Sequence, residues 1–552
     1  MKFLCMLVLA ACAVFAQSGK APQKDACTPP PSGVAPALPA RLMTGQGTVH
    51  FPITTSNPQA QEFFDQGVAQ LHSFWSTEAE RSFRQAADLD PDAPMPYWGI
   101  AMVAAGDYRP RFQLDAYDKV FGKTNPLKAQ ARAVEAAKKA RELAQVPGKA
   151  TDLEKMYIAS IAARRNILGV QESHHPDDDY IHALRAIAAK YPDEIEARSY
   201  LALHLMRGYD LPDKTPRGTT MEAVEILRDL AKRAPDHPGV HHYIIHGWEG
   251  SSFAKEAWPS CERYSELVTN IPHALHMPGH IYSQTGRWED AARSFAAAAE
   301  NERAKIKADS LYGFGHHGHN VHYLATAYSF EGQYDKAKAA AHELLALKEN
   351  PREQASLDGF YSAYRQGWFA MLRTLVQSES WEEILTPGIL PVYDKPRENA
   401  WRHWAMALAY INKRDLEHAK AESSLLDECL REYRDKVKMP VPEPLKVARL
   451  ELDGQLQVAA GHLNRGLTKL QDAAREELRM VYSEPPYYPR PVLEALGEIA
   501  LQHQRPAEAD AAFRRALEQY PNSFKAQNGL RAALDWQNKD RQNEPAVASV
   551  RQ

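Results

Sequence analysis

The chain has few cysteines for its length, five among 552 residues. Cys5 and Cys12 lie in the apolar N-terminal stretch, and the others, Cys27, Cys261 and Cys429, are widely separated. Such cysteines form neither a CxxC site nor the dense disulfide framework of a small secreted domain. We therefore expect no structural zinc site built from thiolates.

An excess of positive charge is also lacking. The 66 lysines and arginines are balanced by 70 aspartates and glutamates, so the net charge is −4, and no basic stripe is present. Because nucleic-acid-binding surfaces are usually basic, we expect no nucleic-acid partner. The sequence also contains no nucleotide-binding loop, no GxSxG elbow and no Ser/His/Asp order that would indicate a serine hydrolase.

The chain has no long hydrophobic run after its N-terminal stretch. No segment in the rest of the sequence reaches the roughly 18 apolar residues of a transmembrane helix. The first sixteen residues, MKFLCMLVLAACAVFA, combine Lys2, an apolar run and a small-residue site ending at Ala16. This order predicts a signal peptide over residues 1–16. We therefore expect a secreted or periplasmic protein without a transmembrane segment. The run LAAC also resembles a bacterial lipobox, so lipid attachment to Cys12 is an open alternative.

Composition divides the rest of the chain into three parts. Residues 17–55 are rich in proline and small polar residues, which predicts an extended linker. Helical periodicity dominates residues 56–535, and residues 536–552 form a polar tail. Within the helical part, irregular spacers are expected near residues 108–150, 208–220, 300–315 and 430–445.

The helical segments repeat one pattern of small, aromatic and apolar residues. It is present in GRWEDAARSFAAAA from Gly286, EGQYDKAKAAAHEL from Glu331 and RPAEADAAFRRALEQYPNS from Arg505. The pattern resembles the tetratricopeptide repeat, a helix–turn–helix unit of 34 residues. The resemblance implies an all-α, right-handed superhelical solenoid, and arrays of this kind mostly bind peptides or act as scaffolds.

Histidines recur at the repeat interval in the centre of the chain. In tetratricopeptide arrays the second, fifth and ninth positions of the first helix face the concave groove, and the resemblance implies this for three successive units here. With 22 histidines in 552 residues, fewer than one would be expected by chance among these nine positions. Seven of the nine are histidine: His242, His246, His273, His276, His280, His319 and His322.

A bound transition metal explains this convergence better than packing does. Buried imidazoles cannot all be charged, and each neutral ring needs a partner for both nitrogens. Neutral imidazole is also the commonest protein ligand of transition metals. The sequence therefore predicts a metal site in the histidine-rich centre, residues 237–326.

Several neighbouring residues are candidates for the same site. Glu249 is expected to be a further ligand or an acceptor for an imidazole N–H. His316, followed by His317, arrives just before the third helix, and Asn320 is a candidate outer-sphere donor. On the same register His237 and His241 point away from the metal face.

The identity and number of the ions are left open by the sequence. A set rich in histidine and poor in carboxylate favours copper or zinc over magnesium or calcium, and iron or haem is a further alternative. Seven histidines suit two ions with about three ligands each, or one ion with an ordered outer shell. The protease motif HExxH is absent, because Tyr243 follows His242. The run SHHPDDDY, from Ser173, is better explained as a solvated turn that opens a helix.

Two functions follow from these features. The first is an exported metalloprotein, either a metal-binding protein or a metal-dependent oxidoreductase or hydrolase. The second is an exported scaffold that binds a peptide or protein partner without metal. Other side chains at groove positions are either core or a wall for a peptide or small apolar ligand: Met95, Trp98, Met102, Phe369, Trp401 and Trp404.

Overall fold

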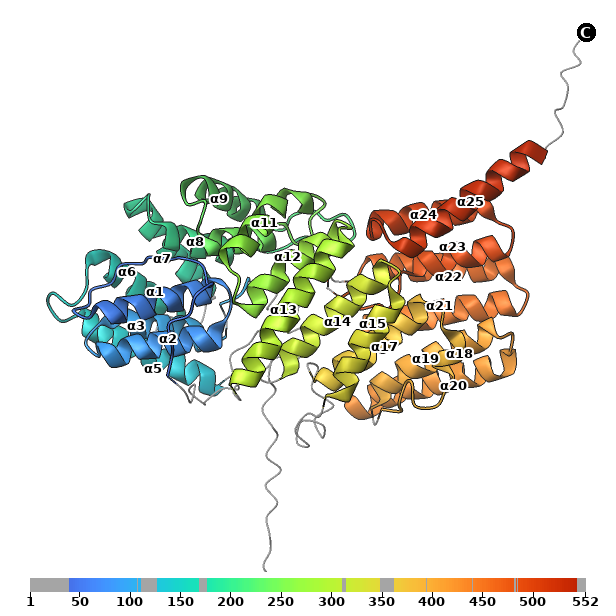
Figure 1. The fold of residues 1–552 in the computed structure, drawn as a ribbon, viewed down its shortest axis with the longest axis horizontal. Coiled ribbons are helices and arrows are strands. Elements are labelled where there is room, and N and C mark those ends of the chain that lie inside the picture. Colours follow the sequence, from blue (N-terminus) through green and yellow to red (C-terminus); the bar gives the residue numbers. More distant parts are fainter. Residues whose placement is uncertain are drawn as a thin grey trace, which may run out of the picture.

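The computed structural model describes most of the chain as an array of packed helices (Figure 1). Within the described residues no β-strand forms, and only two isolated β-bridges are present. This architecture confirms the predicted all-α solenoid of helix–turn–helix repeats. The described residues are 39–106, 108–110, 127–167, 176–309, 314–347, 362–393, 395–438, 440–480, 483 and 485–543. The predicted signal peptide, residues 1–16, lies outside them.

The first half of the array is built from helices that pack mainly against their neighbours in the sequence. They are α1 (Pro58–His72), α2 (Ser76–Leu89), α3 (Pro94–Val103), α5 (Leu127–Ala144), α6 (Asp152–Arg164), α7 (Pro176–Lys190), α8 (Ile195–Leu205), α9 (Thr220–Arg233), α10 (Pro238–Trp248), α11 (Trp258–Leu267), α12 (Pro272–Gln284) and α13 (Trp288–Ala308). A short 3₁₀ helix, η1 (Ala254–Ala257), precedes α11.

The second half continues the array with helices of the same kind. They are α14 (Phe314–Phe330), α15 (Tyr334–Ala346), α17 (Ala363–Gln377), α18 (Trp381–Ile384), α19 (Pro396–Asn412), α20 (Leu416–Glu432), α21 (Glu443–Ala459), α22 (Leu463–Leu478), α23 (Val492–Gln502), α24 (Pro506–Gln519) and α25 (Phe524–Asn543). A π-helical turn, η2 (Tyr433–Val437), follows α20. The last helix continues past the predicted start of the polar tail.

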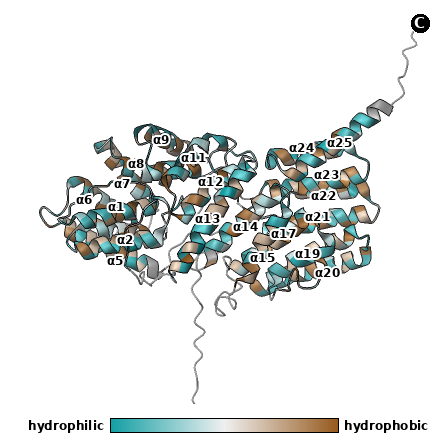
Figure 2. Cartoon of the chain, viewed as in Figure 1, coloured by the Kyte–Doolittle hydropathy of each residue, from teal (hydrophilic) through white to brown (hydrophobic). Residues whose placement is uncertain are grey.

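Small residues let paired helices approach closely. A Cβ atom on Gly279 of α12 would lie 2.4 Å from the Phe295 ring of α13, and one on Gly497 of α23 would lie 2.6 Å from the Phe513 ring of α24. In both pairs the glycine of one helix receives the aromatic ring of the next, as close packing requires. Figure 2 shows hydrophobic and hydrophilic residues alternating along the same helices, as expected when one face is buried.

Two apolar cores fill the array, one built mainly from α1–α13 and the other from α14–α25. The turn between α24 and α25 returns to the middle of the array (Figure 1). There the Trp288 Nε1–H donates a hydrogen bond to the Pro521 carbonyl over 2.8 Å, and the Phe330 and Tyr520 rings stack with centroids 4.9 Å apart. The C-terminal repeat therefore contacts the histidine-rich repeats.

Residues 39–55, the described end of the predicted linker, lie against the first helices without regular structure. The buried Phe51 ring contacts the rings of Phe64 and Trp98 with centroids 5.7 and 5.8 Å away. Trp98, like Met95 and Met102, is fully buried and belongs to the core. No described helix combines the length and hydrophobicity needed to cross a membrane.

Candidate metal centre

Helices α10 and α12 present their histidines in the same register. Each begins at a proline, Pro238 and Pro272, which is favoured in the first turn because proline lacks an N–H. Counted from this proline, the fifth residue is His242 in α10 and His276 in α12, as the 34-residue interval predicts.

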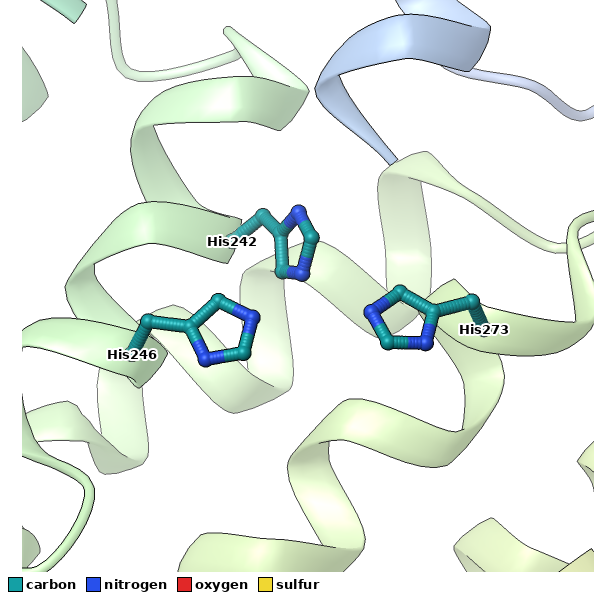
Figure 3. A group of neighbouring side chains, drawn as sticks. All are labelled: His242, His246 and His273. Atoms are coloured by element: carbon teal, nitrogen blue, oxygen red, sulfur yellow. The ribbon is translucent and has the colours of Figure 1, made fainter. Parts of the chain in front are cut away.

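Three histidines from α10 and α12 meet in one place. The structure brings a ligand nitrogen of His242, His246 and His273 to within 4.8 Å of one another. Figure 3 shows one nitrogen of each ring directed toward the space between the three rings. Their centroids lie 4.8, 5.2 and 6.4 Å apart. With a metal–nitrogen distance of about 2.1 Å, two imidazoles on one ion have centroids roughly 5.2 Å apart at a tetrahedral angle and roughly 6.4 Å apart when they lie opposite each other. The two pairs that include His242 match a tetrahedral ion, and His246 and His273 would move closer together on binding it.

Hydrogen bonds at the outer nitrogens fix the orientation of two of these rings. The Nδ1–H of His242 donates to the carbonyl of His72 over 2.5 Å, and the Nδ1–H of His246 donates to Oε2 of Glu249 over 2.9 Å. Each acceptor places the proton on Nδ1 and leaves the lone pair on Nε2, the arrangement common among metal-bound histidines. Among the described residues, the buried Nε2 atom of His242 has no hydrogen-bond partner.

The trio is held in the neutral form. Burial is the main reason that the pKa values of His242 and His273 fall well below the ordinary histidine value, and neighbouring histidines and the Arg109 guanidinium lower them further. Burial by itself would raise the pKa of the Glu249 carboxyl, but His280 and His246 more than offset it, so that pKa is lowered. The site therefore combines uncharged imidazoles with one ionised carboxylate.

A second set of histidines continues from this trio along α12 to α14. The Nε2 atoms of His276 and His280 lie 2.7 Å apart, and the centroid of His276 lies 5.0 Å from that of His319 and 6.3 Å from that of His316. The Nδ1 atom of His280 lies 3.3 Å from Oε1 of Glu249, so this carboxylate contacts both sets.

The histidines of α14 do not all join this cluster. His316 faces it and donates its Nδ1–H to Glu302 of α13, which also accepts from Asn320. His317 instead pairs with Glu343 of α15, and His322 with Gln366 of α17, over 2.9 and 2.6 Å.

The expectation that His316 and His317 precede the third helix is wrong, because α14 begins at Phe314 and contains both. The glycine that follows them serves close packing, since a Cβ atom on Gly318 would lie 2.9 Å from the Cα atom of Ala363.

Sequence reasoning missed a second histidine–carboxylate group behind the trio, formed by His72, Glu196 and His237. Its polar atoms already have partners. His72 bonds Glu196 through Nε2 and the Tyr243 hydroxyl through Nδ1, while His237 bonds Glu196 through Nε2 and accepts from the Val240 N–H through Nδ1. This group therefore supports the turn that carries the His72 carbonyl. Of these three residues, only His237 lies next to the histidine-rich helix in the sequence, so only His237 could have been identified from the sequence as part of such a group.

The turn between α1 and α2 covers the trio. Phe74 adopts a positive φ of 52°, and its ring lies 4.5, 5.3 and 5.6 Å from the rings of His242, His246 and His273. The Arg109 guanidinium lies over the Phe74 ring at 5.5 Å. Only a non-local contact between the first repeat and the centre could produce this arrangement.

The acidic run SHHPDDDY lies apart from these histidines in the sequence. Its two histidines, including His174, lie outside the described residues, and α7 begins at Pro176 as expected for a turn that opens a helix. Asp177 forms an ion pair with Arg164 over 3.2 Å.

A family profile for the tetratricopeptide repeat matches residues 492–523, which contain α23 and α24. The chain is therefore similar to tetratricopeptide-repeat proteins, as the sequence pattern indicated. No curated protein sequence matches it.

Similar solved structures include tetratricopeptide-type helical arrays of low sequence identity. Human IFIT1 in a dimer with m7Gppp-AAAA is 11% identical, with a TM-score of 0.33 and coverage of 88% of this chain and 91% of that one. Yeast Tom70 is 11% identical, with a TM-score of 0.24 and coverage of 89% and 91%.

Proposed function

We propose that the protein binds a transition metal through His242, His246 and His273. The observation that carries this proposal is the orientation of the rings: His242 and His246 each donate Nδ1–H to an oxygen and turn Nε2 toward the other rings. Leaving a buried polar nitrogen without a partner costs about 1–3 kcal/mol. A metal ion supplies the missing partner for the Nε2 atom of His242.

The ligand set favours copper or zinc. Both metals bind neutral imidazole well, whereas magnesium and calcium prefer oxygen ligands. A haem is less well suited, because the ring of His242 lies within 5.2 Å of both His246 and His273 and leaves little space for a macrocycle. Iron would fit the chemistry but is a poorer match for a site without a carboxylate ligand.

Helix α10 offers a matched pair of substitutions for a direct test. His241 lies next to His242 on the same helix and is also buried, but both of its ring nitrogens have partners. Its Nδ1 contacts the Ser260 hydroxyl over 3.1 Å, and its Nε2 contacts the Pro235 carbonyl over 2.7 Å. Equilibrium dialysis of untagged protein against Cu²⁺ or Zn²⁺ should show at least a hundredfold loss of affinity in His242→Ala and less than a threefold change in His241→Ala. Equal affinities in the two variants would contradict the proposed site.

A metal-independent scaffold is the competing function. Tetratricopeptide arrays commonly bind peptides or proteins, and the repeat fold supports an interaction role here. If untagged protein expressed with copper, zinc, iron and haem available contains none of them, and binds neither Cu²⁺ nor Zn²⁺ in dialysis, the scaffold function is favoured.

Export is a separate part of the proposal and rests on residues 1–16. Their order of Lys2, apolar run and small residues supports cleavage after Ala16. N-terminal sequencing of protein from its native source should therefore begin at Gln17. Retained Met1 would contradict export by this signal, and a lipid on Cys12 would support the lipoprotein alternative.

A further inference from the structure

The ring of Phe74 lies directly over the three histidines of the proposed metal site. Its centroid is 4.5, 5.3 and 5.6 Å from those of His242, His246 and His273. Together with the distances among the three imidazoles, these values place the Phe74 centroid about 4 Å from the plane of the imidazole centroids and close to the middle of their triangle, within the roughly 6 Å of a cation–π contact. Phe74 therefore faces the position of a bound ion.

This arrangement leaves no space for a further ligand on the Phe74 side of the ion. An oxygen ligand would lie about 2.1 Å from an ion in that plane and would need about 3.5 Å more to clear the ring carbons. Both distances do not fit into the gap of about 4 Å between the plane and the ring. A ligand from solvent cannot reach the ion on this side while Phe74 stays in place.

The backbone of Phe74 is in a conformation that favours glycine. Its N–H donates to the Leu71 carbonyl over 3.0 Å, and the Trp75 N–H donates to the Gln70 carbonyl over 2.9 Å, so α1 ends in a Schellman motif with Phe74 at the left-handed position, φ 52°. Other helices of the array carry glycine or a polar residue at the equivalent position: Gly286, Gly332, Arg414 and Gln504. Because a bulky residue is disfavoured there, the Phe74 ring is held over the trio at a conformational cost.

The same turn also orients a ligand. The carbonyl of His72, two residues before Phe74, accepts the Nδ1–H of His242 over 2.5 Å. Other rings beside the trio lie on helices, namely those of Tyr243, Tyr264, His276 and His316. Moving one of these would displace part of a helix, whereas a turn can swing a side chain aside by rotation about a few backbone bonds.

We propose that Phe74 is the gate of the metal site: its ring closes one face of the bound ion, and the ion enters and leaves when the turn from Ser73 to Trp75 moves the ring aside. This inference rests on the proposed metal site and adds the residue that controls access to it. A gate slows uptake and release together, so it changes the rates of exchange more than the Kd.

Rates of ion exchange test the gate. Untagged protein is loaded with an equimolar amount of Zn²⁺, with Cu²⁺ in a parallel series, and release to an excess of a coloured chelator is followed by stopped-flow absorbance. Phe74→Gly removes the ring and keeps the turn, since glycine adopts a positive φ freely. Its uptake and release should each be at least tenfold faster than in wild type, while the Kd from equilibrium dialysis changes less than fivefold. Phe74→Leu restores apolar bulk and should give intermediate rates.

Trp75→Leu is the matched control in the same turn. Trp75 is also buried, and its ring lies 4.6 Å from the ammonium of Lys305 on α13. Its release rate should stay within threefold of the wild-type rate. Equal acceleration in Trp75→Leu and Phe74→Gly would overturn the gate, because it would show that any loosening of the turn speeds exchange.

The outcomes separate the gate from the metal site. A wild type that holds neither ion would contradict the metal site, and the gate with it. An ion that Phe74→Gly holds and exchanges at the wild-type rate would overturn the gate and leave the metal site standing. Circular dichroism shows whether each variant keeps the helical array. Should Phe74→Gly lose it, Phe74→Leu carries the test, with release at least threefold faster than in wild type as the expected result and an unchanged rate as the contradicting one.

Discussion

The C-terminal core and the histidine cluster both bury polar side chains, and they satisfy them in different ways. In the C-terminal core, Glu451 accepts hydrogen bonds from Arg490 and Gln455 over 2.6 and 3.0 Å and from the Tyr488 hydroxyl. In the histidine cluster, outer nitrogens such as Nδ1 of His242 have protein acceptors while Nε2 atoms point inward. The first network is complete within the chain, and the second is completed by a metal in our proposal.

The largest effect is expected from breaking the complete network. Glu451→Ala would leave the buried Arg490 guanidinium without its carboxylate, which costs about 3–5 kcal/mol when one partner of a buried pair is removed. Chemical denaturation should show this loss. The folded fraction should still bind the same amount of metal, because Glu451 lies outside the histidine cluster.

An exposed ion pair provides the control for that substitution. Glu443 pairs with Lys446 over 2.6 Å with both side chains more than half exposed, 68% and 51%. Glu443→Ala should change stability little, since surface pairs contribute about 0–1 kcal/mol. A loss as large as that of Glu451→Ala would mean that burial is not what distinguishes the two pairs.

The second largest effect is expected from supplying or removing the metal. A ligand that binds only the folded state stabilises it by about 2.7 kcal/mol at a concentration one hundred times its Kd. Cu²⁺ or Zn²⁺ should therefore raise the Tm of metal-free wild type, and a chelator should reverse the change. His242→Ala should show a much smaller rise. A wild-type Tm that does not depend on either metal would contradict the account.

Two buried groups, His322 beside the histidine cluster and Glu477 in the C-terminal core, should respond to pH with opposite signs in the metal-free protein. Burial lowers the pKa of His322 from 6.5 to about 3, so the unfolded chain binds more protons and stability falls as pH drops below 6.5. Burial raises the pKa of Glu477 from 4.5 to about 8, so the folded chain binds more protons and stability falls as pH rises from 4.5 toward 8.

Single substitutions can separate these contributions. Each group contributes about 2 kcal/mol between pH 7 and pH 5, from 1.36 kcal/mol per pKa unit. On moving from pH 7 to pH 5, His322→Gln should therefore lose about 2 kcal/mol less stability than wild type, and Glu477→Gln should lose about 2 kcal/mol more. Urea denaturation at both values checks this, and an unchanged pH difference in either variant would contradict the assignment for that residue.

The smallest effect on metal binding is expected from a substitution in the group formed by His72, Glu196 and His237. Glu196 reaches His242 only through the turn at His72, so Glu196→Gln should weaken Cu²⁺ binding by no more than about tenfold and leave the number of bound ions unchanged. Loss of a whole ion in this variant would show that the His72, Glu196 and His237 group binds metal itself.

The sequence predicts those parts of the molecule that repeat. The 34-residue interval placed His242 and His276 at equivalent positions of α10 and α12, because each repeat packs in the same way against its neighbours. The prediction of an irregular spacer near residues 108–150 missed one helix, because α5 occupies Leu127–Ala144. Its sequence, LKAQARAVEAAKKARELA, is rich in alanine and has high helix propensity.

Other features depend on contacts between distant residues and left no local pattern. His72 and Tyr243 are separated by 171 residues, and His72 and Glu196 by 124. The side chain of Phe74 covers the trio only because the first repeat packs on the centre of the array. His316 was expected before the third helix, but α14 contains it, and Gly318 provides space for Ala363 within the same helix.

The most direct test of the account is a crystal structure of metal-loaded protein with anomalous difference maps recorded at the copper and zinc edges. The account predicts a peak within about 2.0–2.1 Å of the inward nitrogens of His242, His246 and His273. It predicts no peak between His72, Glu196 and His237, whose polar atoms already bond one another or the chain. A map without a peak at the trio, or with its only peak between His72, Glu196 and His237, would contradict the central claim.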